Sequence, residues 1–405
     1  MAEQLEDDRA LRRVCVTGGT GFIASHIVLQ LLEAGVAVHA TVRSKKSPNV
    51  AFLLELAERT GGTLELFEAS LEKANSYDSA VQNCDTVIHT ACPVVQNPAD
   101  PVKELITPSV QGTLNVLASV LKEAQHQYRR NQQGDGAFAA MRVVMTSSDA
   151  AIYPSGAKSC DRVLTEADWN TTADVHSPYP LAKKLAEEAA WTFMESDEAA
   201  EVGLSMAVCN PSLVVGPPLG RRVPASCSLV CDLLVPTLPG SVPLNWPIVD
   251  VRDVASAHIA AAARRAASGR YILTSADNMY VGDMADALHE AFPQEPVPLR
   301  KFPALVLYAI ALFDSRISLS WARLHANRIF FFSNERAKKE LGVTFRGAKQ
   351  SIQDCGKALL DSGLVRERRE ALAKKNKVWK GRAVLAASVS IAVLGLLWWK
   401  RRSLF

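Results

Sequence analysis

Short apolar runs alternate with segments of helical spacing along most of the chain. Val14 to Val16 form an apolar run typical of a buried strand, and the apolar positions that follow recur at helical spacing, namely Phe22, Ile23, Ile27, Val28, Leu31 and Leu32. Further strand-like runs occupy residues 36–42 and 141–145. Continuous apolar strands separated by helices predict a doubly wound α/β fold, in which helices cover both faces of a parallel sheet.

The turn after the first apolar run carries a glycine pattern, Gly18-x-x-Gly21-x-x-Ala24, between a predicted strand and a predicted helix. Glycines in such a turn let the backbone approach a pyrophosphate, and the helix N-terminus offers free N–H groups and partial positive charge. A glycine-rich turn in an ordinary α/β protein is the alternative. The flanking strand and helix favour a dinucleotide site in a Rossmann-type sheet.

The residues after the second strand indicate which dinucleotide binds. An NAD enzyme presents an acidic side chain to the ribose hydroxyls about 20 residues after the glycines, whereas here Arg43, Lys45 and Lys46 follow the strand. A guanidinium with nearby ammonium groups suits a 2′-phosphate. We expect NADP(H) as the cofactor, a solvated basic loop being the alternative.

A second motif indicates proton chemistry. Tyr179 and Lys183 lie four residues apart in a segment rich in helix formers, YPLAKKLAEEAAWTFM, so one helix face presents both side chains. An ammonium beside a phenol favours its ionised form. Upstream, the apolar run that ends at Met145 is followed by Ser147 and Ser148, at the sheet edge where such folds bind ligands.

Together these motifs resemble those of the extended short-chain dehydrogenase/reductases, within the branch of dihydroflavonol and cinnamoyl-CoA reductases. The likeness covers roughly residues 11 to 360 and includes VTGGTGFIASHIV, VVMTSSDAA, SPYPLAKKLAEEAAW and IVDVRDVASAHIAA. It implies that Tyr179 donates a proton to a substrate carbonyl, that Ser148 is its hydrogen-bond partner and that Lys183 holds the nicotinamide ribose. It also implies further cofactor contacts, at Gly18, Thr20, Gly21, Phe22, Ile23, Arg43, Lys46, Leu71, Thr90, Ala91, Pro211 and Ser212.

Two positions depart from this family pattern. Ser70 precedes Leu71 where these enzymes usually carry an Asp that holds the adenine, so that contact is expected to be weaker. Tyr153 stands where dihydroflavonol reductases place an asparagine that contacts the flavonoid, which argues against a flavonoid substrate.

The expected organisation is a Rossmann domain over residues 11–216 and 247–275, with a smaller, discontinuous substrate lobe over 217–246 and 276–360. A basic juxtamembrane linker is expected over 361–382 and a transmembrane tail anchor over 383–399, where the chain is uncharged and mostly apolar, with basic residues on both sides and two tryptophans at its end. As a helix this run would reach about 25 Å. A buried helix or docking tail is the alternative.

This anchor places the protein in a membrane by a single C-terminal pass, with its catalytic domain in the cytosol. The endoplasmic reticulum is expected, and the mitochondrial outer membrane and the peroxisome remain open. The formal net charge is +3, with bases concentrated before the anchor, so the expected partner is a membrane and not a nucleic acid. The eight cysteines lack metal-ligand spacing, and no metal is expected. The oligomeric state is left open.

We therefore expect a membrane-anchored, NADP(H)-dependent oxidoreductase that interconverts a carbonyl and a secondary alcohol on a lipophilic small molecule. One alternative is an NAD-dependent 3β-hydroxysteroid or sterol dehydrogenase, which Arg43 argues against. A nucleotide-sugar epimerase shares the fold but fits the TVRS strand end poorly. An alternative of another class is a catalytically silent, NADP-sensing membrane scaffold.

Overall fold

The computed structural model describes residues 9–93, 95, 98–133, 140–235, 239–313 and 319–374. Its larger sheet has seven strands in the order β3-β2-β1-β4-β5-β6-β9, and every neighbouring pair is parallel. The strands are β1 (Arg13–Thr17), β2 (Ala37–Val42), β3 (Leu64–Glu68), β4 (Thr86–His89), β5 (Arg142–Thr146), β6 (Ser205–Pro211) and β9 (Gly269–Leu273). The predicted doubly wound parallel sheet is confirmed.

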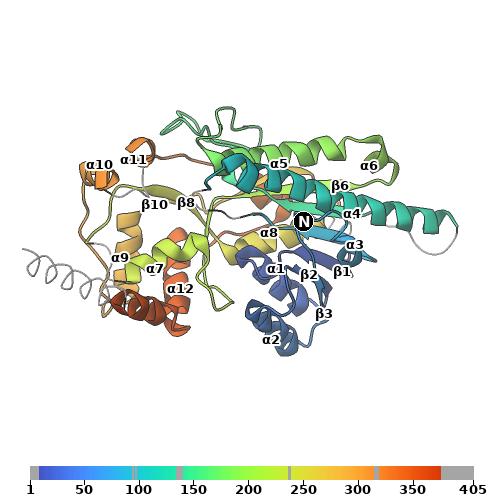
Figure 1. Ribbon diagram of the computed structural model, residues 1–405, viewed down its shortest axis with the longest axis horizontal. Coiled ribbons are helices and arrows are strands. Elements are labelled where there is room, and N and C mark those ends of the chain that lie inside the picture. The colour runs from blue at the N-terminus through green and yellow to red at the C-terminus, as the bar shows by residue number, and fades with distance from the viewer. Residues whose placement is uncertain are drawn as a thin grey trace, which may run out of the picture.

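Helices cover both faces of this sheet, as Figure 1 shows. On one face, α1 (Phe22–Glu33) and α2 (Ala51–Thr60) pack beside α8 (Val251–Ala263), and on the other α4 (Thr107–Gln132) packs along α5 (Pro178–Met194), with the short α3 (Asp78–Val81) and α6 (Asp197–Glu201) nearby. Two hydrophobic clusters match the two faces: Val14 and Val16 join the first, and Cys15 joins the second. Because side chains alternate along a strand, one apolar strand supplies both cores.

A smaller unit lies at one end of the larger sheet, on the left of Figure 1. Its three strands are β7 (Leu213–Val215), β8 (Asn245–Asp250) and β10 (Asn278–Tyr280), in the order β10-β8-β7. Its core is lined by α7 (Ser228–Leu234), α9 (Val281–Ala291) and α12 (Ala348–Asp361). Two further helices, α10 (Ala304–Phe313) and α11 (Leu319–His325), pack against each other beside it. The smaller unit is therefore assembled from several distant stretches of the chain.

The predicted membrane anchor is overturned. Among the described residues, no helix is long and apolar enough to cross a membrane, and the predicted span, 383–399, lies outside those residues. The predicted single-pass membrane location is corrected with it. An uncharged run that reaches about 25 Å as a helix is shorter than a hydrocarbon core of about 30 Å, so its apolar character alone does not require a span.

The basic stretch that was expected to lie beside a membrane has partners within the smaller unit, as far as it is described. Residues 364–374 are helical, and Leu364 and Val365 are buried in the core of that unit. Arg368 pairs with Asp232, and Arg369 pairs with Glu295. The charge of these arginines is thus balanced by acids of the same fold.

A buried ion pair ties α5 to the far strand of the larger sheet. Glu187 on α5 is fully buried and accepts a hydrogen bond from Arg270 of β9 at 2.6 Å, and the arginine is 6% exposed. Glu187 also accepts from Ser147 at 2.5 Å and from Asn210 at 3.0 Å. Because its lone pairs are filled from three strands, this carboxylate is held in one place and fixes the helix above the sheet.

Replacing Glu187 by Ala is expected to lower the free energy of unfolding by about 3–5 kcal/mol, because it leaves Arg270 buried without its partner. The matched control is Glu188→Ala, the next residue, whose carboxylate is 43% exposed and pairs with Lys184 at 3.6 Å. Urea denaturation of both variants measures the difference. Equal losses in the two variants would show that the buried pair does not hold the helix.

Candidate functional site

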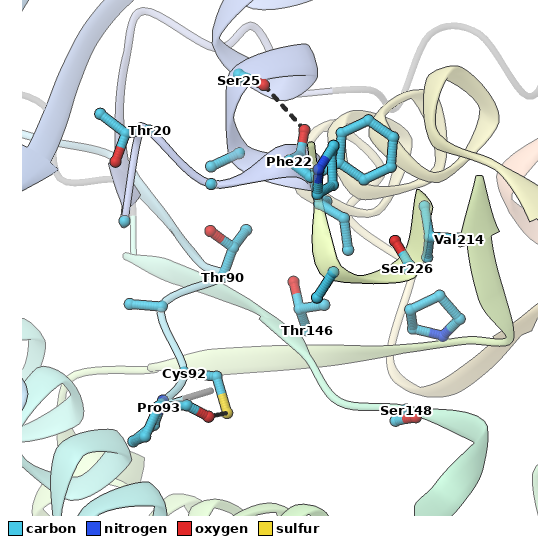
Figure 2. A pocket seen from close by; sticks show the side chains of 18 of the residues that line it. Thr20, Phe22, Ser25, Thr90, Cys92, Pro93, Thr146, Ser148, Val214 and Ser226 are labelled. Atoms are coloured by element: carbon cyan, nitrogen blue, oxygen red, sulfur yellow. Dashed lines mark hydrogen bonds between the residues drawn. The ribbon is translucent and has the colours of Figure 1, made fainter. Parts of the chain in front are cut away.

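One large cavity runs along the carboxyl edge of the larger sheet and continues toward the smaller unit. Its volume is about 1530 Å³, which is larger than a typical drug-sized site and is enough for a dinucleotide beside a substrate. Its lining includes all the predicted site residues except the two basic residues Lys45 and Lys46. Figure 2 shows part of this lining, with Thr20 and Phe22 at one end, Ser148 at another, and Thr90 and Thr146 between them.

The glycine turn forms one end of the cavity. Gly18 follows β1 with φ +69°, in the left-handed region that favours glycine, and a Cβ there would lie 3.2 Å from the Cα and Cβ of Ala91. Gly21 precedes α1 and provides no side-chain cap. The first N–H groups of α1 are therefore left for a ligand, which suits a pyrophosphate.

The ends of β1 and β4 are joined through the hydroxyls of Thr17 and Thr90. Thr17 Oγ1 accepts hydrogen bonds from the backbone N–H groups of Thr90 and Ala91, both at 3.1 Å. The Thr90 hydroxyl in turn donates to the carbonyl of Thr17 at 2.5 Å. The strand order reverses between these two strands, and such switch points are where open α/β sheets bind ligands.

The basic residues after β2 separate into two groups. Arg43 is exposed and lines the cavity, whereas Lys46 is exposed and does not line it. The ammonium of Lys45 lies 5.8 Å from the centre of the Phe67 ring. Of the three bases, Arg43 is thus the one that lines the cavity.

Three further cofactor candidates, Leu71, Pro211 and Ser212, also line the cavity. Leu71 lines the cavity, and its carbonyl accepts a hydrogen bond from Asn115 of α4 at 2.7 Å. Pro211 ends β6 and is buried, as is Ser212, whose hydroxyl has no hydrogen-bond partner among the described residues. A buried hydroxyl without a hydrogen-bond partner costs free energy, and a bound ligand can supply that partner. Ser212 is therefore suited to meet a bound group.

Ser148, Tyr179 and Lys183 come together from two elements. Ser148 follows β5 and is 6% exposed, and Lys183 on α5 is 7% exposed, with its ammonium donating to the carbonyl of Thr146 at 3.2 Å. Tyr179 lies one turn earlier on α5 and is 45% exposed at the cavity. The helix therefore presents the phenol and the ammonium to the end of β5, as the spacing predicts.

The pKa of Tyr179 is raised above its ordinary value. Withdrawal of the phenol from bulk water by the surrounding protein is the largest cause, and the charge of Lys183 and the Ser148 hydroxyl act in the opposite direction. Burial lowers the pKa of Lys183, but Cys92, Tyr179 and Glu187 together raise it. At neutral pH the phenol therefore carries its proton and the ammonium its charge, the state that suits proton donation to a carbonyl.

Aromatic and basic side chains from distant segments form the far part of the cavity. Tyr153 stacks on Phe330 with ring centres 5.2 Å apart, and the guanidinium of Arg328 lies 4.5 Å from the centre of the Tyr153 ring. Phe332 and Trp246 line the same cavity. The apolar area here suits a lipophilic substrate, and Tyr153 takes part in it through ring stacking.

Sequence reasoning missed Asp149, Glu187, Asn210 and Arg270. Glu187 lies four residues after Lys183, so its helical spacing was a usable signal. Asp149 follows Ser148 directly, and its acidic side chain at a strand end was another. Nothing local marked Asn210 or Arg270, whose partners are far away in the sequence.

The fold and this site are those of a nucleotide-dependent oxidoreductase, with a Ser/Tyr/Lys set beside a glycine turn. A family model for the NAD dependent epimerase/dehydratase family matches residues 14–274. The chain belongs to this family, in its branch of extended reductases similar to cinnamoyl-CoA and anthocyanidin reductases. The predicted family and the predicted NAD(P)-dependent oxidoreductase class are confirmed.

Individual relatives agree with this assignment. A cinnamoyl-CoA reductase from Medicago truncatula is 36% identical over 291 residues, covering 70% of this chain and 82% of that protein. An anthocyanidin reductase from Vitis vinifera is 35% identical over 306 residues, covering 71% and 83%. Among solved structures, a yeast methylglyoxal/isovaleraldehyde reductase complexed with NADPH has 28% identity and a TM-score of 0.66, covering 88% and 99%. This NADPH complex and the family assignment support the predicted NADP(H) cofactor.

Gly18→Ala is expected to weaken NADPH binding severalfold, because the added Cβ would press on Ala91 at the switch point. The matched control is Gly35→Ala, since Gly35 has φ +72° and nothing within 4 Å of an added Cβ. Both variants carry the left-handed backbone cost of about 1–2 kcal/mol. Cofactor fluorescence titration measures affinity, and equal affinities in the two variants would contradict a role of the turn in binding.

Proposed function

We propose that this protein is an NADP(H)-dependent reductase that interconverts a carbonyl and a secondary alcohol on a lipophilic small molecule. The observation that carries the proposal is that one cavity contains the glycine turn, Arg43 and the Ser148, Tyr179 and Lys183 set. NADPH, when bound, supplies the hydride. The remaining chemistry belongs to the side chains of the chain.

In this proposal Tyr179 donates its proton to the carbonyl oxygen as the alcohol forms. Ser148 donates a hydrogen bond to the same oxygen and orients it, and Lys183 holds the nicotinamide ribose while its charge favours the phenolate that remains. Lys183 is suited to this because its ammonium is anchored on the carbonyl of Thr146. A charged group held in a partly buried site acts more strongly than one in water.

The other residues receive roles in the same proposal. The turn from Gly18 to Ile23 holds the pyrophosphate and Arg43 the 2′-phosphate, with Leu71, Thr90 and Ala91 on the adenosine side and Pro211 and Ser212 near the nicotinamide. The larger sheet, within residues 11–216 and 247–275, would carry the cofactor. The smaller unit, whose strands are β7, β8 and β10, would shape the substrate site. Lys46 does not line the cavity. It would assist cofactor binding only from the protein surface.

The proposal is tested with the purified full chain. NADPH and NADH are titrated by fluorescence, and consumption of NADPH is then followed with aldehydes, ketones, sterones and flavonoids. Turnover of lipophilic carbonyls with NADPH supports the reductase. A preference for NADH with sterones would favour a sterol dehydrogenase, and NADPH binding without turnover of any compound would favour a sensor.

Tyr179→Phe is expected to lower kcat by about 10²–10⁴-fold, the contribution of a positioned general acid. The ring remains, so NADPH affinity is expected to stay within about twofold. Stopped turnover with intact cofactor binding identifies the phenol as the proton donor. Full activity of this variant would remove Tyr179 from that role.

Arg43→Glu is expected to shift the preference from NADPH toward NADH by about tenfold or more, because hydrogen bonds to a charged group contribute about 1.5–3 kcal/mol. Lys46→Glu is the matched control, since it makes the same charge change at a residue that does not line the cavity. The ratio of kcat/KM for the two cofactors is the measurement. Equal shifts in both variants would assign the preference to general charge and not to Arg43.

A further inference from the structure

Asp149 follows Ser148 and accepts the hydrogen bond that the Ser148 hydroxyl would otherwise donate to a substrate carbonyl. The Ser148 hydroxyl donates a hydrogen bond to Asp149 Oδ1 at 3.0 Å, and the backbone N–H of Ala150 donates to Ser148 Oγ at 3.2 Å. Both Ser148 and Asp149 line the cavity. A hydroxyl has a single proton to donate. While Ser148 donates to Asp149, it therefore cannot donate to a substrate carbonyl.

We propose that Asp149 is a positioning residue whose protonation state sets the direction in which the Ser148 hydroxyl donates. As a carboxylate, Asp149 accepts the Ser148 proton and turns the hydroxyl away from the substrate. As a neutral acid, it donates its own proton to Ser148 Oγ and leaves the hydroxyl free for the carbonyl oxygen. This inference rests on the proposed reductase function of the same site.

No proton of Asp149 is consumed in this arrangement. The carbonyl carbon gains the hydride of NADPH, and the carbonyl oxygen gains the proton of Tyr179. Asp149 keeps its proton throughout, and Ser148 keeps its own while it donates a hydrogen bond. Asp149 thus changes how well Ser148 orients the substrate without touching the reacting atoms.

The charges around Asp149 allow both forms near neutral pH. Burial raises the pKa of Asp149 to about 7, while the hydrogen bond from Ser148 and the charge of Arg328 lower it. Three elements bring titratable or charged groups to it: Arg328 from the segment after α11, Tyr153 from the loop after β5, and Tyr179 from α5. The pKa values of both tyrosines are raised above the ordinary value, so both phenols are uncharged near neutral pH. The charge that acts on Asp149 at this pH is that of Arg328.

The test is the pH dependence of kcat for the full chain, with saturating NADPH and a carbonyl substrate from the panel. For the natural protein, kcat is expected to fall about tenfold from about pH 6 to about pH 8, as the neutral fraction of a group with a pKa of about 7 falls. In Asp149→Asn this fall is expected to disappear, because the amide donates permanently to Ser148 Oγ as the neutral acid does.

Two further variants separate this role from a structural one. Asp361→Asn removes an exposed carboxylate on α12 that pairs with Lys357 at 2.6 Å, and it is expected to keep the natural profile. Arg328→Gln removes the cation that lowers the pKa of Asp149, so the midpoint of the fall is expected to move to higher pH. A loss of packing alone would change the height of the profile and leave its midpoint in place.

The outcomes distinguish this inference from the proposed function. If the natural protein turns over a carbonyl and Asp149→Asn keeps the same fall, or loses activity equally at every pH while binding NADPH normally, Asp149 does not direct Ser148. If Arg328→Gln leaves the midpoint of the pH profile unchanged, the fall in kcat does not report the ionisation of Asp149. If the natural protein turns over no carbonyl at any pH, the proposed function fails and this inference fails with it.

Discussion

The buried ion pair between Glu187 and Arg270 is the constraint on which the site depends. Lys183 lies one helical turn before Glu187, and Tyr179 lies one turn before Lys183, so fixing Glu187 above the sheet fixes the register of both side chains. Asn210 donates to Glu187 and also to the carbonyl of Ser148. The same buried charge therefore positions both the helix with Tyr179 and Lys183 and the strand end with Ser148.

The sheet topology explains why the glycine turn and the Ser148, Tyr179 and Lys183 set share one cavity. All seven strands run in the same direction, so their carboxyl ends meet at one edge. The glycine turn follows β1, the Thr90 and Ala91 turn follows β4, and Ser148 follows β5. Because these strands are neighbours in the sheet, residues far apart in the sequence become adjacent at its carboxyl edge.

The predictable parts of the molecule are those whose signals are local. The glycine turn needs a strand, a bend and a helix in sequence, and the Tyr179 and Lys183 pair needs a helix, so both follow from residue spacing. Arg270 could not be found in this way, since its partner lies 83 positions away in the sequence. The apolar run near the C-terminus was also a local signal, but apolar length alone did not suffice to define a membrane span.

The substrate side of the cavity is where sequence reasoning ends, for a physical reason. Tyr153, Trp246 and the neighbouring pair Arg328 and Phe330 come from three separate segments, and they line one cavity only in the folded chain. No spacing rule in the sequence links such residues. The shape and charge of the cavity wall that they form therefore exist only in the folded chain. The glycine-turn end of the cavity is formed largely by backbone and by glycines. The part of the cavity around Tyr153 and Phe330 is built from side chains, so its shape can change by substitution while the backbone of the glycine turn stays the same.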